Sequence, residues 1–238
     1  MAAPFALPEV FHWENYQQAW TMGKLGTALV NSVLVCGITL VVSLFFGAMA
    51  AFAIARMRWK LSEAAHTFFL IGMMVPVHCI LIPLFVRFAG LGLTNSRVGL
   101  MIPYITFSLP MTIFLLTGFF KSMPGELFEA ASIDGAGKWR QFFSVTIPLI
   151  TPVIFYNFVT QLCNKFQEFN GPFIVTQGGP LRSTTLVSLL VYNNAFKSYE
   201  MGMASAIAWL LFLIIMTLTG VAFFSQKYWV YYSDEDGR

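Results

Sequence analysis

Five long stretches of the chain contain no Asp, Glu, Lys or Arg. Each stretch is mostly apolar, and together they cover residues 25–55, 64–86, 98–120, 141–164 and 201–226. A helix needs about 20 such residues to cross the ~30 Å hydrocarbon core of a bilayer, where unpaired backbone amides are costly. The pattern therefore predicts an all-α polytopic membrane protein with about five transmembrane helices.

Prolines lie inside the second, third and fourth stretches. They are Pro76 and Pro83, Pro103 and Pro110, and Pro148 and Pro152. In water, prolines at such positions argue against helices, but helices packed in a membrane accept them because neighbouring groups pair with the freed backbone. We therefore expect kinked spans at these positions.

The composition agrees with a lipid environment. Hydrophobic residues make up 57% of the chain and charged residues 11%, whereas a soluble domain has roughly 45–50% and about 25%. The formal net charge is +3, and the basic residues are scattered, which argues against a nucleic-acid partner. Cys36, Cys79 and Cys163 lie far apart within apolar stretches, so we expect no metal site.

Basic residues indicate the orientation of the spans, because they accumulate in cytoplasmic loops. The densest cluster runs from Arg56 to Lys60 in a short connection. This favours a cytoplasmic location for residues 56–63, for residues 121–140 and for the C-terminus. Five spans then leave the N-terminus outside.

Three segments follow from this orientation. The first segment has neither the basic nor the apolar region of a signal peptide. Either a short tail is translocated unaided or a preceding helix is missing, and we favour the missing helix. The aromatic residues of the first segment suit a membrane interface. The segments are an external N-terminal segment over residues 1–24, a transmembrane domain over 25–226, and a cytoplasmic tail over 227–238.

The connection after the third stretch predicts a short helix in the cytoplasm. Pro124 suits a first helical turn, and Glu126 and Glu129 suit the positive end of the helix dipole. Gly135 and Gly137 then interrupt the helix. Its apolar and small side chains offer a surface that a partner protein can grip: Leu127, Phe128, Ala130 and Ala131.

This connection resembles the Glu-Ala-Ala motif in the membrane subunits of ABC importers. The motif continues with three residues, Gly, nine residues and Ile-x-Leu-Pro. Here it reads Glu129-Ala130-Ala131, Gly135 and Val145-x-Ile147-Pro148. The resemblance implies that residues 121–148 form a coupling loop that docks in a cleft of an ATPase subunit. Glu129 would act through polar contacts, and Gly135 would permit the turn.

The resemblance extends over nearly the whole chain and points to sugar-importer permeases of the maltose-transporter class. Features before about Glu126 are similar to one of the two paired permeases of that class, namely Asn31-Ser32, Ala53-x-Ala55-Arg56 and Val75-Pro76. Later features are similar to the other, namely Gln177-Gly178-Gly179-Pro180 and the tail from Lys227 to Tyr232. The resemblance implies an ABC type I importer permease fold that lacks its usual first helix. The mixture suggests a hybrid of the two permease types.

Polar residues recur at helical spacing along the fourth stretch, so a helix brings them to one face: Asn157, Gln161, Asn164 and Glu168. Polar groups inside a membrane face a cavity or another helix. One interpretation is a translocation pathway whose amides bind sugar hydroxyls, with Tyr156 or Phe166 packed against the sugar ring. The other is packing against the second permease. Glu168 and Lys165 also suit the external end of the span.

Gly135-Ala136-Gly137-Lys138 differs from a phosphate-binding loop, because that pattern requires Gly where Ser132 stands and Ser or Thr where Trp139 stands. We therefore expect no nucleotide cofactor on this chain. The chain is then a transport subunit rather than an enzyme, and the resemblance implies that ATP and Mg²⁺ bind to partner ATPase subunits.

The resemblance implies the permease subunit of an ATP-driven importer, which translocates a sugar or oligosaccharide across the inner membrane of a bacterium or archaeon. Its partners would be ATPase subunits, a second permease subunit and an extracytoplasmic solute-binding protein, within a lipid bilayer. The external turn at Gly178–Pro180 would either contact the binding protein or form an ordinary loop. Two alternatives stay open: a permease for an amino acid or polyamine, and an ATP-independent channel or carrier.

Overall fold

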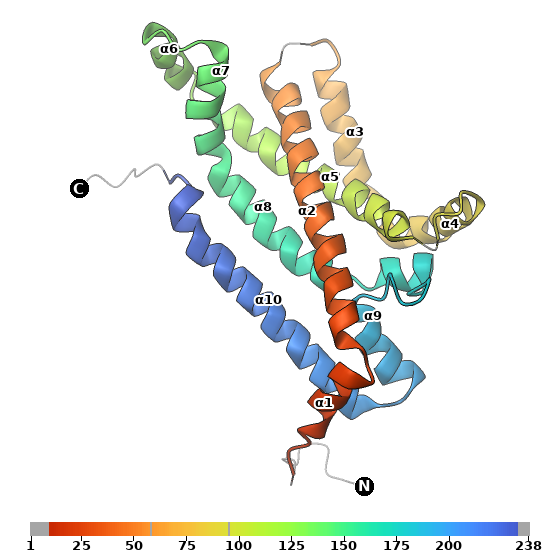
Figure 1. Ribbon diagram of the computed structural model, residues 1–238. Coiled ribbons are helices and arrows are strands. Elements are labelled where there is room, and N and C mark those ends of the chain that lie inside the picture. The colour runs from red at the N-terminus through yellow and green to blue at the C-terminus, as the bar shows by residue number, and fades with distance from the viewer. Residues whose placement is uncertain (1–9, 58, 95, 233–238) are drawn as a thin grey trace.

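The structure, a computed structural model, describes residues 10–57, 59–94 and 96–232. Within these residues, four helices are long and apolar enough to cross a membrane, and they confirm four of the predicted spans. They are α2 (Leu25–Arg56), α5 (Arg97–Ser122), α10 (Met201–Trp229) and the helical run Lys138–Thr176, whose central part is α8 (Ile147–Gln167). Figure 1 shows them as long rods that cross one another at an angle.

The second apolar stretch forms two helices rather than one kinked span. α3 (Ser62–Met74) and α4 (Val77–Gly90) meet at an angle of 95°. Val75 and Pro76 between them are extended, with ψ of 116° and 123°. A residue before proline is disfavoured in the helical conformation, so the helix ends there. The expectation of a simple kink at Pro76 was therefore wrong, whereas the prolines inside α4, α5 and α8 remain within helices.

Short helices occupy the two ends of the bundle. α6 (Glu126–Ile133) and α7 (Lys138–Gln141) lie at the end where α2 finishes and α3 begins (Figure 1). α1 (Glu14–Thr21) and α9 (Val187–Tyr192) lie toward the opposite end. Three π-helical turns complete the regular structure of the described residues: Phe142–Thr146, Pro172–Thr176 and Asn193–Lys197. The segments predicted to be cytoplasmic thus gather at one end.

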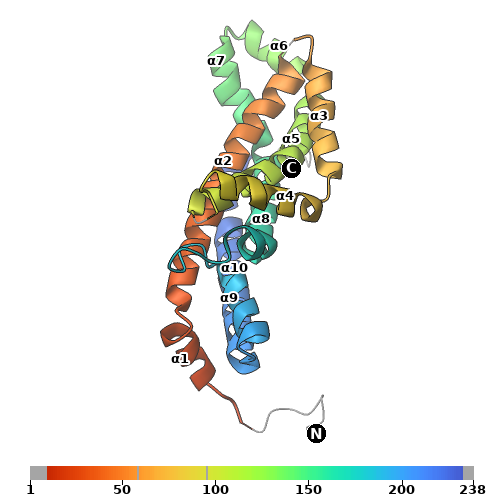
Figure 2. The same cartoon turned by 90° about the vertical axis from the view of Figure 1, so that its right-hand side faces the viewer.

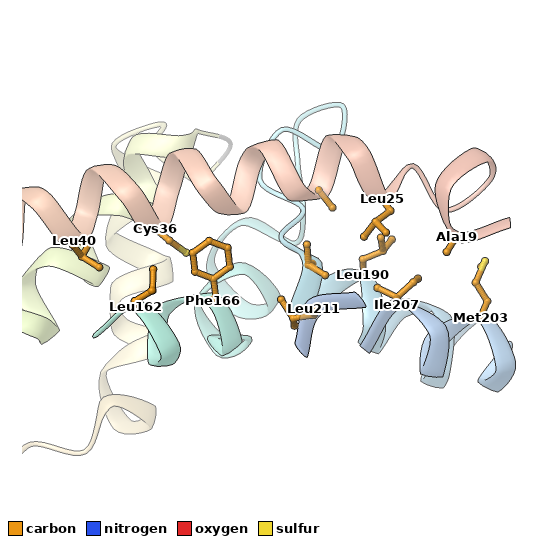
Figure 3. Packing of buried hydrophobic residues seen from close by; sticks show 12 residues of the cluster. Ala19, Leu25, Cys36, Leu40, Leu162, Phe166, Leu190, Met203, Ile207 and Leu211 are labelled. Atoms are coloured by element: carbon orange, nitrogen blue, oxygen red, sulfur yellow. The ribbon is translucent and has the colours of Figure 1, made fainter. Parts of the chain in front are cut away.

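The largest buried cluster joins α2 to α8, α9 and α10. Its side chains pack along the first half of α2, as Figure 3 shows: Leu25, Cys36, Leu40, Leu162, Phe166, Leu190, Ile207 and Leu211. A second cluster lies nearer α6 and joins α2, α5 and α8 around Ala51, Leu116, Phe120 and Ile150. α2 belongs to both clusters, so it is the element on which the others pack.

Large apolar side chains also cover the outside of the molecule. Phe68 on α3 and Phe224 on α10 are among many that stay exposed. The molecule is narrow when seen edge-on (Figure 2), so few helices are surrounded on all sides. In water such a surface would aggregate, whereas lipid tails or another membrane subunit can cover it.

Candidate functional site

The four polar residues predicted on one helical face line a single cavity between α4, α5 and α8. The cavity has a volume of about 250 Å³. Asn157 and Gln161 are buried in its wall, Glu168 is half-buried and Asn164 is exposed. The facing helices supply Val77 and Leu81 from α4 and Pro103, Tyr104, Phe107, Ser108, Met111 and Leu115 from α5.

Gln161 is the centre of a hydrogen-bond network that joins three helices. Its Nε2 donates to Oγ1 of Thr112 on α5 at 2.8 Å and to Oδ1 of Asn157 at 2.6 Å. Its Oε1 accepts from the hydroxyl of Ser43 on α2 at 2.8 Å. Gln161 therefore packs helices together within this chain and also lines the cavity.

Lys165, which stands beside these polar residues in the sequence and also suited the external end of the span, lies in the cavity wall. The side chain is 5% exposed, and its Nζ donates to the Tyr104 carbonyl oxygen at 3.1 Å and to the Ser108 hydroxyl at 2.7 Å. The Sγ of Cys36 on α2 donates to the Lys165 carbonyl oxygen at 3.2 Å. The spacing of four residues from Gln161 was the signal that placed Lys165 in the cavity wall.

Glu168 ends the polar face where α8 stops. Its Oε1 accepts the backbone N–H groups of Asn170 at 3.0 Å and Gly171 at 3.3 Å, so the carboxylate caps the turn that follows. In the part of the chain that the structure describes, no salt bridge joins Glu168 to Lys165. Both charges therefore border the cavity without pairing to each other.

Two buried polar atoms of the cavity wall lack a hydrogen-bond partner among the described residues. They are Nδ2 of Asn157 and the hydroxyl oxygen of Tyr104. Buried polar groups are nearly always paired, because an unpaired one costs about 1–3 kcal/mol. The wall therefore holds hydrogen-bonding capacity that the protein itself does not use.

The aromatic side chains expected beside the cavity are different ones. Phe166 is buried in the cluster between α2 and α10, and Tyr156 is exposed and lines a separate groove with Phe119. Tyr104 and Phe107 of α5 line the cavity instead. Only the packing of α5 against α8 reveals them, because nothing in the sequence connects these two segments.

The end of α6 has the geometry of a Schellman motif. Gly135 has φ of 76°, its N–H donates to the Ser132 carbonyl at 3.1 Å, and the Ala136 N–H donates to the Ala131 carbonyl at 2.9 Å. Glycine is favoured here because a Cβ atom disfavours the left-handed region. The turn expected at Gly135 is thus present, and it redirects the chain from α6 into α7.

The segment after Gly135 is tied back to the end of α6. Gln141 on α7 reaches back across the turn, where its Nε2 donates to the Ser132 hydroxyl at 2.9 Å and to the Ala136 carbonyl at 2.8 Å. Pro148 is the second residue of α8. The π-helical turn Phe142–Thr146 runs directly into α8 here, and the Ile147 N–H donates to the Phe142 carbonyl oxygen.

The outer surface of this loop combines acidic and apolar side chains. Glu129 and Ala130 are exposed, and Ile133 and Trp139 are 86% and 78% exposed. Phe128, which was expected on this surface, packs instead against the cluster around Phe120. The loop therefore presents a surface that the rest of the described chain does not cover.

At the opposite end of the bundle, the connection between residues 177 and 186 is tied to two helices. Asn31 on α2 donates from Nδ2 to the carbonyls of Arg182 at 2.8 Å and Thr185 at 3.2 Å. Arg97 on α5 donates to Oδ1 of Asn31 at 3.0 Å and to the Ser183 carbonyl at 3.2 Å. Leu181 at its tip is fully exposed.

These features define a multi-pass helical membrane protein. It has a polar cavity among its helices and a short, exposed helix, α6, at one end. Residues 43–230 match the family described as the binding-protein-dependent transport system inner membrane component, and the chain belongs to this family.

Relatives and solved structures agree with this assignment. The chain is 39% identical over 208 residues to the diacetylchitobiose uptake system permease protein NgcG of Streptomyces coelicolor, a match that covers 83% of this chain and 68% of NgcG. It is 35% identical over 146 residues to the trehalose transport system permease protein SugB of Mycobacterium tuberculosis, covering 61% of this chain and 53% of SugB.

The fold is that of solved ABC transporters. A chain of a bacterial transporter that imports the acidic polysaccharide alginate superposes with a TM-score of 0.78 at 15% identity, covering 92% of this chain and 84% of that chain. At this low identity, the likeness concerns the fold alone.

Proposed function

We propose that the protein is the membrane-spanning permease subunit of an ATP-driven importer that moves a sugar or oligosaccharide across a bacterial or archaeal inner membrane. The observation that carries this proposal is α6, a helix held at one end of the bundle with Glu129 and Ala130 exposed, Ala131 half-buried and the left-handed Gly135 at its end. Such a helix does little for the core of this chain, so its exposed surface suits a partner.

The partner at α6 is an ATPase subunit that binds ATP and Mg²⁺. Glu129 supplies a polar contact, Ala130 and Ala131 allow close approach, and Gly135 sets the direction of the loop toward Pro148. Exposed Ile133 and Trp139 add apolar area around these contacts. Apolar and aromatic side chains of this kind carry much of the binding energy at protein interfaces.

The cavity between α5 and α8 is the proposed part of the translocation pathway on this chain. Asn157, Gln161, Asn164 and Glu168 offer amide and carboxylate groups that suit sugar hydroxyls, and the Tyr104 ring suits the apolar face of a sugar. Relatives that are named for diacetylchitobiose and trehalose uptake support a sugar as the solute.

Two further partners complete the proposed complex. A second permease covers part of the exposed apolar surface, and an extracytoplasmic solute-binding protein contacts the end of the bundle that carries residues 177–186. The anchoring of this connection by Asn31 and Arg97 supports the second contact, because it holds the exposed Leu181 in a fixed position.

Capture of an ATPase subunit tests the docking role of α6. A tagged chain is co-expressed with the candidate ATPase and purified from detergent-solubilised membranes. We expect the native loop to retain the ATPase and Glu129→Ala and Gly135→Asp to lose most of it. Glu126→Ala is the matched control, because Glu126 is an exposed acid on the same helix outside the Glu-Ala-Ala segment. Equal retention by all four chains would contradict docking at this segment.

A further inference from the structure

Arg56, the last residue of α2, lies against the coupling loop. Its guanidinium carbon is 4.5 Å from the centre of the Phe128 ring in α6, and its Nη2 donates to the Met123 carbonyl oxygen at 3.4 Å. A planar guanidinium can stack on a ring and donate a hydrogen bond at the same time. The end of α2 is thus joined to the segment that leads into α6.

Phe52, one turn earlier on α2, packs against the chain both before and after α6. Its ring packs edge to face against Phe120 at the end of α5, with 5.6 Å between ring centres, and against Phe142 after α7, with 5.3 Å between ring centres. Arg56 and Phe52 therefore contact the chain on both sides of α6. A displacement of α6 in any direction strains contacts to α2.

α2 is also the helix best suited to carry such a displacement. It runs for 32 residues without a proline, whereas α4, α5 and α8 each contain at least one inside the helix. Proline removes a backbone hydrogen bond and permits bending, so α2 is the stiffer element.

The middle of α2 contacts the cavity wall. Ser43 lies about 20 Å along the helix from Arg56, by the rise of 1.5 Å per residue, and its hydroxyl donates to Oε1 of Gln161 at 2.8 Å. Further along, Cys36 donates to the Lys165 carbonyl oxygen. Gln161 and Lys165 both line the cavity. One helix thus contacts the coupling loop at its end and, in its middle, two residues that line the cavity.

We propose that Arg56 is a positioning residue that couples α6 to the cavity through α2. The inference rests on the proposed function, in which an ATPase moves α6. When α6 is displaced, the contacts of Arg56 with Phe128 and Met123 carry the end of α2 with it. The Ser43 hydroxyl then shifts against Gln161, and the cavity wall changes shape.

The test measures access to the cavity rather than transport, so it needs no knowledge of the solute. Thr160 lines the cavity and is exposed, and it is replaced by cysteine in a Cys79→Ser, Cys163→Ala background. The complete complex in proteoliposomes is treated with a maleimide, with or without MgATP and vanadate. We expect nucleotide to change the labelling rate about fivefold or more when Arg56 is native, in the range of ordinary coupling between sites.

Arg56→Leu removes the guanidinium, and we expect it to abolish the nucleotide-dependent change in labelling while the ATPase remains bound. Lys60→Ala is the matched control, because it removes an exposed cation from the same connection, and we expect the change to persist. A full change in labelling with Arg56→Leu would overturn the inference.

Arg56→Lys decides the matter if Arg56→Leu does not assemble. It keeps the charge and an apolar stem but loses the planar group, so we expect a reduced change in labelling. A change equal to that of the native chain would then overturn the inference. Failure of the native chain to capture an ATPase would instead overturn the proposed function, and this inference with it.

Discussion

Gly135 and Gly137 are two residues apart, yet only Gly135 adopts a left-handed backbone conformation that residues with a Cβ atom disfavour. Gly135 has φ of 76°, whereas Gly137 has φ of −64° and open space around its Cα atom. A side chain in the left-handed region costs roughly 1–2 kcal/mol. We expect Gly135→Asp to abolish ATP-driven uptake while the protein remains in the membrane, because the turn after α6 changes direction.

Gly137→Asp is the control for this prediction, since it adds the same charge at a permissive position. Uptake and the amount of protein in the membrane are measured together for both variants. Full uptake with Gly135→Asp, or equal loss with Gly137→Asp, would count against a specific role for the left-handed turn.

Gln161 has a structural role that can be separated from contact with a solute. Gln161→Leu removes its hydrogen bonds with Ser43, Thr112 and Asn157 and leaves these buried groups without their partner. We expect a loss of about 1–2 kcal/mol in the free energy of unfolding, the scale of a hydrogen bond between membrane helices. Thermal unfolding of the purified chain in detergent measures it.

Thr217→Val serves as the comparison for Gln161→Leu. Thr217 is exposed on α10, and its hydroxyl donates within its own helix to the Leu213 carbonyl. We expect this change to leave the unfolding temperature nearly the same. A similar temperature shift in both variants would mean that the network around Gln161 does not hold the helices together.

At the residue scale, the spacing of polar residues predicted which four residues share one face of α8. It did not predict which further side chains belong to that face. Helical period alone brings Asn157, Gln161, Asn164 and Glu168 together, and the cavity contains all of them. The sequence left the placement of Lys165 open, because a long lysine stem can reach either an interface or a buried acceptor. The acceptors on Tyr104 and Ser108 belong to another helix, and no local pattern reveals them.

At the scale of elements, the sequence did not predict which prolines end a helix and which lie inside one. Pro76 ends a helix, whereas Pro83, Pro103 and Pro152 lie inside helices. All of them stand in apolar stretches without charges. The outcome depends on which neighbouring elements pack against the interrupted turn, and this tertiary information is not present in a hydrophobic pattern.

The crossing of α2 and α5 depends on a glycine. A Cβ atom added to Gly47 would lie 2.9 Å from Cβ of Thr112, closer than real Cβ contacts, so the two backbones approach at this point. We expect Gly47→Leu to destabilise the chain by about 1–3 kcal/mol through overpacking. Thermal unfolding in detergent checks this loss.

Gly37→Leu is the matched control on the same helix, because a Cβ atom there has nothing within 4 Å. We expect Gly37→Leu to unfold at nearly the temperature of the native chain. If Gly47→Leu were tolerated equally well, α2 and α5 would not pack as closely as described.

At the scale of the whole molecule, charge-free stretches and basic loops predicted the arrangement of the ends. The segments around Arg56 and α6 gather at one end of the bundle, as the basic residues suggested (Figure 1). The chain after α10 joins them, because the Tyr231 N–H donates to the hydroxyl of Thr151 near the start of α8. The packing angles of the helices were not predictable, since they depend on contacts such as Gly47 with Thr112.

ATP-driven sugar uptake tests the central claim most directly. The chain is reconstituted in proteoliposomes with its ATPase, second permease and binding protein, and entry of labelled diacetylchitobiose and trehalose is measured with ATP or a non-hydrolysable analogue. We predict uptake of at least one sugar that requires ATP hydrolysis and the binding protein. Uptake that proceeds equally without the ATPase would contradict the account, because α6 would then have no coupling role.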